Sequence, residues 1–97
     1  MAEIIWSDPA LDEFDAIAAH IALDKPVAAA RFVARVLTRV EQLARFPLAG
    51  GKPRELAGTR YRQLVVPPVR VFYRVEGEHV FIVHVTRSER LIRRSDF

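Results

Sequence analysis

Two amphipathic helix patterns follow one another between residues 8 and 46, and only the short break "DKP" separates them. In the first pattern Asp8 is the predicted N-cap, and apolar residues recur at three-to-four spacing until about Leu23. The second pattern runs from Val27 to Phe46. A connection this short predicts an antiparallel helix hairpin.

Strand patterns lie on both sides of the hairpin. The run "EIIW" at 3–6 predicts one strand before it, and three segments after it, at about 60–66, 69–76 and 79–86, have strand-like composition. The breaks "PP" and "EGE" between these three are short, so we expect antiparallel neighbours. The predicted order is βααβββ, an α+β fold in which the hairpin packs on a small, mainly antiparallel sheet, within one domain spanning 1–97.

Arginine recurs at alternate positions of the predicted strands. Arg60 and Arg62 share one face of their strand, and Arg70 and Arg74 share a face of the next strand with Phe72 between them. The neighbours of opposite parity on that second strand are Val69, Val71, Tyr73 and Val75. We therefore expect one face of the sheet to pack on the helices and the other to carry arginine.

The arginines continue beyond the last strand, at Arg87, Arg90, Arg93 and Arg94. For any single arginine, solvation with a snorkelling stem is an equal alternative. The group as a whole favours a surface that binds something anionic. The net charge of +3 and pI near 10.0 agree, and favour nucleic acid, a nucleic-acid machine or an acidic protein as partner.

Several classes of protein are excluded by composition. The chain has no cysteine, which removes disulfides, Cys-type zinc sites and thiol nucleophiles. It has no apolar run long enough to span a membrane and no signal-peptide pattern, so we expect a cytoplasmic protein without a membrane partner. The hydrophobic fraction of 51% argues against disorder.

Histidine is the remaining candidate for proton transfer or metal binding. His20, His79 and His84 lack metal-ligand spacing, and we predict neither a metal site nor a cofactor. His84, three residues before Arg87, is either a sheet-edge histidine or a general acid or base where arginines hold a phosphate. In a regular strand the two residues lie on opposite faces, so the catalytic alternative needs a bend.

Three stretches carry a family pattern: "DPALDEFDAIAAHIALDKPVAAARFV", "LARFPLAG" and "PRELAGTRYRQLVVPPVRVFYRVEGEHVFIVHVTRSER". Across essentially its whole length the chain resembles the RelE/ParE superfamily of type II toxin–antitoxin toxins. The most telling parts are the Lys-Pro break of the hairpin, the Pro-x-x-Gly exit, the "R-x-FYR" strand and the final arginines. The resemblance implies a bacterial growth inhibitor held inactive by a cognate antitoxin, whose amphipathic acidic segment would dock on the basic surface.

One branch of the superfamily, the RelE-like toxins, consists of ribosome-dependent mRNA endonucleases, with ribosome and mRNA as partners. On that resemblance the catalytic residues would be Arg62, Arg87 and His84, and Lys52 or Arg54, Arg60 and Arg70 would supply further positive charge. The C-terminal tyrosine frequent in those enzymes is missing here, and only His84 or Phe97 could substitute for it.

ParE-like toxins inhibit DNA gyrase by binding it and trapping cleaved DNA. The long hairpin and the lack of an obvious proton-transfer residue resemble this branch better. The target-binding surface would then comprise Arg60, Arg62, Arg70, Arg74, Arg87, Arg90, Arg93 and Arg94, with the segment from Arg87 to Arg94 responsible for toxicity.

A third alternative is a degenerate toxin that only binds its antitoxin; overexpression without effect on growth would favour it. The oligomeric state stays open. The apolar helix positions allow a homodimer through the hairpin or a toxin–antitoxin hetero-oligomer, but the same positions can equally be core.

Overall fold

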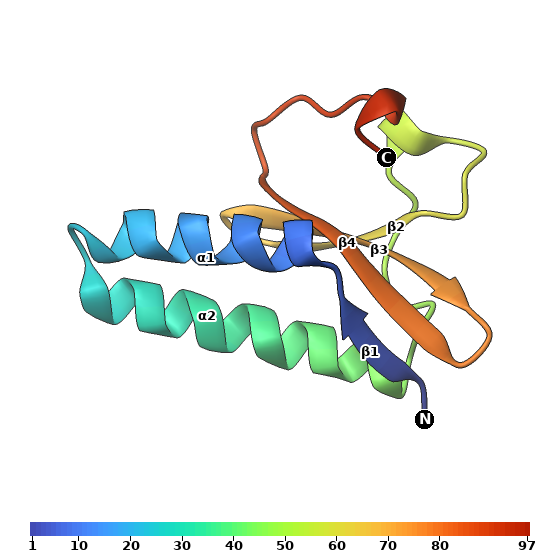
Figure 1. The fold of residues 1–97 in the computed structure, drawn as a ribbon, viewed down its shortest axis with the longest axis horizontal. Helices are drawn as coiled ribbons and strands as arrows, with labels where there is room; N and C mark the ends of the chain where they lie inside the picture. Colours follow the sequence, from blue (N-terminus) through green and yellow to red (C-terminus); the bar gives the residue numbers. More distant parts are fainter.

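The predicted order of elements is confirmed. The computed structural model describes residues 1–97, and Figure 1 shows the helix hairpin beside the sheet. The elements are β1 (Glu3–Trp6), α1 (Asp8–Ala22), α2 (Pro26–Glu41), β2 (Arg62–Val66), β3 (Val69–Glu76) and β4 (His79–Arg87). Short 3-10 helices lie at Gln42–Ala44, Arg54–Leu56 and Arg94–Asp96. No helix is long and apolar enough to reach across a bilayer.

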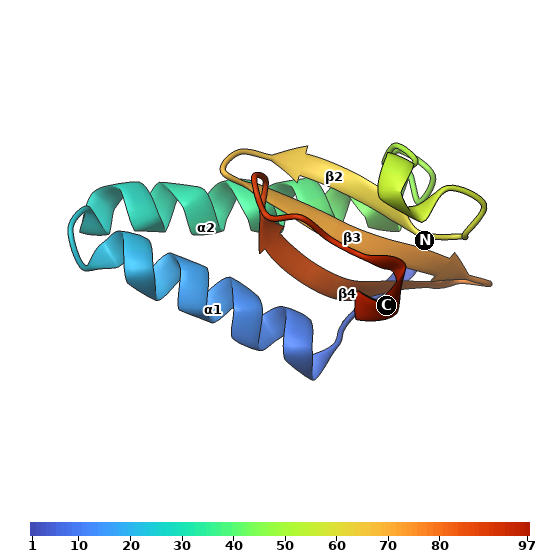
Figure 2. The same ribbon diagram turned by 90° about the horizontal axis from the view of Figure 1, so that it is seen from above.

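The four strands form one mixed sheet in the order β1-β4-β3-β2. The pairs β2–β3 and β3–β4 are antiparallel, as expected from their short turns, whereas β1 runs parallel to β4 with Ile4 opposite Val80. In Figure 2 the sheet lies in front of α2, and both helices pack on the same face. Parallel pairing of the first and last strands is possible because the hairpin provides a long crossover between them.

The helix boundaries differ from the prediction at two points. Ser7, not Asp8, is the N-cap of α1: its backbone is extended, and its Oγ accepts a hydrogen bond from the Ala10 N–H at 3.1 Å. The Ser7 hydroxyl also donates to the Val83 carbonyl of β4 at 3.2 Å, which ties the cap to the sheet. The second helix ends at Glu41, because the chain tightens into a 3-10 turn before Pro47.

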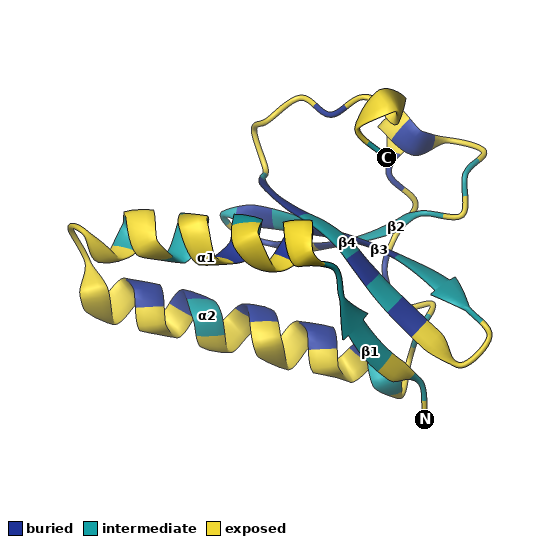
Figure 3. Cartoon of the chain, in the orientation of Figure 1, coloured by how far each residue is buried: buried dark blue, intermediate teal, exposed yellow.

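The main core lies between the hairpin and the sheet. The alternation on β3 is confirmed on this side, since Val69, Val71 and Tyr73 are fully buried. They meet helix residues such as Phe32 and Val36, which form the dark buried stripe along α2 in Figure 3. Burial of each large apolar side chain contributes about 1.5–3 kcal/mol, so this layer accounts for most of the fold's stability.

The opposite face of the sheet is not the open arginine surface that we predicted. Phe72 is fully buried there, in a second small cluster with Leu56 and Ile92. Tyr61, Val83 and Phe97 pack around this cluster. The expectation was wrong because strand parity identifies the face of a residue but not what covers that face. Here the C-terminal segment, residues 88–97, folds back over it (Figure 1).

A β-bulge shifts the register of β4. Tyr73 lies opposite Ile82, whereas Phe72 lies opposite His84, so Val83 is the extra residue. After the bulge Val85 returns to the helix side, and Arg87 lies opposite Val69 at the end of the strand. His84 and Arg87 therefore lie on opposite faces, and the bulge does not bring them together.

Candidate functional site

The arginines on the far face of the sheet form ion pairs with glutamates. The Arg70 guanidinium donates to both carboxylate oxygens of Glu55, at 2.9 and 3.2 Å, and to Gln63 Oε1 at 3.2 Å. Such a bidentate pair is among the stronger hydrogen-bonded ion pairs. The hydrogen bond from Arg70 lowers the pKa of Glu55 below its ordinary value of 4.5. Arg70 is only 12% exposed at its side chain, so little of its charge faces solvent.

Glu76 pairs with two further arginines, Arg60 and Arg74. Its carboxylate lies 2.6 Å from the Arg60 guanidinium and 3.1 Å from Arg74 Nε. The Arg74 hydrogen bond and the nearby Arg60 charge lower the pKa of Glu76. Arg74 also lies over the Phe81 ring, 4.6 Å from its centroid. Each arginine here has an internal partner that an anionic ligand would have to displace.

Arg62 lies on the helix side of the sheet, because it is paired with Tyr73 across β2 and β3. Its guanidinium donates to the carbonyls of Leu48 and Gly50, at 3.3 and 2.8 Å. The Tyr73 hydroxyl accepts from the Gly50 N–H and donates to the Pro47 carbonyl, both at 2.8 Å. Burial raises the pKa of Tyr73. Arg62 and Tyr73 together hold the loop after α2. Arg60, which we expected on the same face as Arg62, instead forms an ion pair with Glu76.

Both ring nitrogens of His84 have hydrogen-bond partners. Nδ1 lies 3.1 Å from the Glu13 carboxylate on α1, and Nε2 lies 2.8 Å from the Asp96 carbonyl in the C-terminal segment. The Phe97 ring packs edge-on against the imidazole at 4.8 Å. A phosphate or 2′-hydroxyl therefore has no free nitrogen to approach on His84 in this conformation. No group of three His, Asp or Glu side chains forms a candidate metal site.

The C-terminal arginines are held mainly by backbone contacts. Arg94 donates to the Ala57 carbonyl at 2.8 Å, and the Arg93 N–H is capped by Asp96 at 2.9 Å. No carboxylate pairs with the side chain of Arg90, Arg93 or Arg94, and all three residues are exposed. The guanidinium groups of these three arginines are therefore without ion-pair partners, unlike those of Arg60, Arg70 and Arg74.

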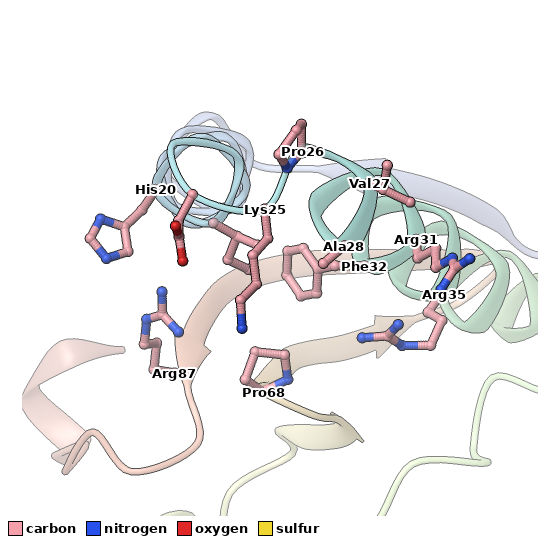
Figure 4. A pocket seen from close by; sticks show the side chains of 12 residues that line it. His20, Lys25, Pro26, Val27, Ala28, Arg31, Phe32, Arg35, Pro68 and Arg87 are labelled. Atoms are coloured by element: carbon pink, nitrogen blue, oxygen red, sulfur yellow. The ribbon is translucent and has the colours of Figure 1, made fainter.

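The largest depression lies at the closed end of the helix hairpin (Figure 4). Its volume is about 820 Å³, and it lies between the turn that joins α1 to α2, the start of β3 and the end of β4. Its cationic residues are Lys25, Arg31, Arg35 and Arg87. Arg35 donates to the Pro67 carbonyl at 3.1 Å, and the other three form no ion pair. We call this depression the hairpin-end groove.

Of these groove residues, only Arg87 was a predicted site residue. The repeat of arginine every four residues along the second helix was visible in the sequence, but it fits a solvated helix face equally well. What the sequence does not show is that the end of β4 brings Arg87 to the same place. Glu13, the partner of His84, was not predicted as a site residue, because nothing in the sequence links α1 to β4.

Comparison with known proteins identifies the family of this chain. The sequence model described as "ParE toxin of type II toxin-antitoxin system, parDE" matches residues 4–92. This chain belongs to the ParE toxin family. It is therefore a toxin of a type II toxin–antitoxin system, as the resemblance to the RelE/ParE superfamily implied, and ParE toxins pair with a cognate ParD antitoxin.

Two relatives of this ParE toxin carry toxin names. The putative toxin Y4kP of Sinorhizobium fredii is 43% identical over 75 residues, which cover 77% of each chain. Toxin RelE2 of Caulobacter vibrioides is 36% identical over 92 residues, covering 94% of this chain and 100% of that protein.

Solved structures show the same fold. The chromosomal ParDE toxin–antitoxin system of P. aeruginosa contains a chain with a TM-score of 0.77 and 27% identity, over 92% of this chain and 98% of that one. A YoeB/ParE toxin from Agrobacterium tumefaciens has a TM-score of 0.63 at 22% identity, over 90% and 98%. The α+β architecture of this ParE toxin is thus that of its family.

Proposed function

We propose that this ParE toxin arrests bacterial growth by binding and poisoning DNA gyrase, and that a cognate antitoxin neutralises it. The observation that carries the proposal is the closed environment of His84, which has both ring nitrogens bonded and Phe97 against its ring. A toxin whose candidate proton carrier is closed off acts through binding better than through acid–base chemistry.

The target-binding residues that we propose are those with free charge. Arg90, Arg93 and Arg94 are exposed and lack carboxylate partners, and Arg87 begins the same stretch. The other candidates, Arg60, Arg70 and Arg74, contribute only if their glutamates are displaced. Arg62 supports the loop after α2, and its effect on gyrase binding would be indirect.

The direct experiment measures supercoiling by purified gyrase with increasing amounts of the purified chain, and probes for trapped cleaved DNA. We expect loss of supercoiling together with accumulation of linear DNA. Supercoiling that continues unchanged at a large excess of toxin would refute gyrase as the target. Heat-unfolded and refolded protein serves as a control for carry-over of antitoxin.

Ribosome-dependent mRNA cleavage is the second candidate, favoured by the 36% identity to a protein named Toxin RelE2. Its test is primer extension on a message translated in a reconstituted system with the chain added. Cuts at the ribosomal A site would require the C-terminal segment to leave His84, because the Asp96 carbonyl occupies Nε2. Intact message would leave gyrase as the target to pursue.

A further inference from the structure

The hairpin-end groove adjoins a second, smaller depression, because Arg35 lines both. The second depression has a volume of about 380 Å³ and lies between α2 and the end of β2, where Val66 and Pro67 line it. The cationic residues of the two depressions therefore form one row. We call this row the basic track, and its members are Lys25, Arg31, Arg35, Arg39 and Arg87.

The basic track has a regular spacing along α2. Arg31, Arg35 and Arg39 are four residues apart, which places them on one side of the helix about 6 Å apart along its axis. At the closed end of the hairpin Lys25 and Arg87 continue the row. Figure 4 shows their side chains reaching into the groove from the start of α2 and from the end of β4.

Acidic residues are scarce around the basic track. The helix α2 has no acidic residue before Glu41, and Asp24 is the only acidic residue that lines either depression. No member of the track forms an ion pair, whereas Arg60, Arg70 and Arg74 on the sheet each have a glutamate partner. Cations held near one another repel, so an anionic occupant stabilises this arrangement.

The geometry of the track favours a nucleic-acid backbone as this occupant. Duplex DNA carries one charge per about 1.7 Å of its axis, so every cation in a row spaced by about 6 Å can face a phosphate. An arginine guanidinium also donates two parallel hydrogen bonds to a phosphate. In a protein interface the centre is apolar and charges lie at the rim, whereas here the charges run through the centre of both depressions.

The lining favours a duplex over a single strand. Unpaired bases bind by stacking on exposed aromatic rings. Phe32 is the only Phe, Tyr or Trp residue in the lining of the two depressions, and it is 1% exposed. The track therefore fits the phosphates of a duplex, in which the bases are already stacked.

We propose that the basic track binds the backbone of duplex DNA, independently of its sequence, and that this DNA is the segment held by gyrase. The second half of this inference rests on the proposed function. The toxin then contacts the enzyme through the exposed arginines of residues 90–94 and the DNA through the track. Two linked contacts bind more tightly than either contact alone, because the second forms within the same complex.

The first test measures DNA binding by the full chain, purified free of antitoxin. Fluorescence anisotropy follows a labelled duplex of about 20 base pairs between about 50 and 200 mM salt. We expect the logarithm of the binding constant to fall against the logarithm of salt concentration with a slope of about −4, as contacts with four or five phosphates give. Two duplexes of unrelated sequence should bind equally.

The decisive variant is Lys25→Gln combined with Arg31→Gln, because both side chains are exposed and unpaired. It should bind DNA about tenfold more weakly and reduce the salt slope by about 2. The matched control is Lys52→Gln with Arg54→Gln, which removes the same two residue types at exposed positions outside both depressions. The control should keep its affinity within about twofold.

Four results would overturn the DNA site. They are no DNA binding by the wild-type chain at about 50 mM salt, equal losses in the two double variants, tighter binding of an RNA duplex, or displacement of the DNA by polyglutamate as effectively as by unlabelled duplex at equal charge. Tighter RNA binding would assign the track to RNA, and displacement by polyglutamate would make it a surface for acidic proteins.

The gyrase assay separates this inference from the proposed target. The variant Lys25→Gln with Arg31→Gln should still bind gyrase in the absence of DNA, yet trap about tenfold less cleaved DNA than the wild type. Unchanged trapping would refute the role of the track. A wild-type chain that binds duplex DNA through the track but does not inhibit gyrase would refute the proposed target and support the DNA site.

Discussion

The Glu13 carboxylate on α1 accepts hydrogen bonds from two consecutive residues of β4, the His84 ring and the Val85 backbone N–H, each at 3.1 Å. His84 in turn reaches the Asp96 carbonyl. One carboxylate thus links the hairpin, the sheet and the C-terminal segment. Both ring nitrogens of His84 therefore face an oxygen atom, one from α1 and one from the C-terminal segment.

Removing the Glu13 carboxylate should destabilise the fold. In Glu13→Ala the Val85 N–H loses its partner, and an unsatisfied buried donor costs about 1–3 kcal/mol. Urea unfolding measures the change, with Asp12→Ala and Asp15→Ala as controls because both carboxylates are exposed on the same helix. Equal stability of all three variants would mean that the link contributes nothing.

Phe97 should hold the C-terminal segment closed. Its ring lies 5.1 Å from Tyr61, 5.2 Å from Phe72 and 4.8 Å from His84. We expect Phe97→Ala to lower the free energy of unfolding by about 1–2 kcal/mol. Trypsin should then cleave several-fold faster at the arginines of residues 90–94. Leu91→Ala is the control, since Leu91 is 89% exposed, and similar digestion of both variants would contradict the role of Phe97.

Removing the Tyr73 hydroxyl should destabilise the fold. Tyr73→Phe leaves the Gly50 N–H and the Pro47 carbonyl without their partner, and we expect a loss of about 1–3 kcal/mol by thermal or urea unfolding. Tyr61→Phe should change stability by less than about 0.5 kcal/mol. Gly50→Ala should also destabilise, because an added Cβ would lie 2.5 Å from the Tyr73 hydroxyl.

Stability should fall on acidification in a way that depends on Glu55. Its pKa is lower in the folded protein than 4.5, so its ion pair stabilises the fold above that pH and is lost as pH falls through the folded value. Glu55→Gln should therefore show a smaller loss of stability below about pH 4.5 than the wild type. Solvent exposure of Glu55 keeps the effect below about 1 kcal/mol. Parallel acid curves would exclude this pair as a contributor.

Truncation after Thr86 should unfold the toxin rather than only disarm it. The cut removes Ile92 and Phe97, which complete the cluster around Phe72.

The double variant Arg90→Gln with Arg93→Gln tests the target surface without removing a buried residue, because both side chains are exposed. We expect about tenfold weaker gyrase inhibition. Circular dichroism checks folding of both, and full inhibition by the double variant would place the target surface elsewhere.

The order of elements was predictable because helix period, strand alternation and proline breaks are local properties. Val69, Val71 and Tyr73 face the helices as their parity indicated. The far face was not predictable, because its cover comes from residues 54–61 and 88–97, whose sequences have no regular period. The parallel pairing of β1 with β4 likewise depends on contacts between distant parts of the chain.

For the candidate site, the sequence allowed us to predict the residue types but not their partners or positions. The abundance of arginine on β3 was plain, but its neutralisation by Glu55 depends on a loop that returns to the sheet. The bulge at Val83 reverses the parity of every later residue of β4, and no glycine or proline marks it. A single extra residue thus determines that Arg87, opposite Val69, lies on the helix side of the sheet.

The pairing of β1 with β4 has a consequence for how the toxin is made. Ile4 lies opposite Val80 on β4, so the first strand is synthesised long before its partner exists. Contacts this distant in sequence form late, because closing so long a chain costs entropy before any pairing rewards it. The first strand of the nascent polypeptide therefore has no partner until β4 has been synthesised, and the four-stranded sheet is completed only at the end of translation.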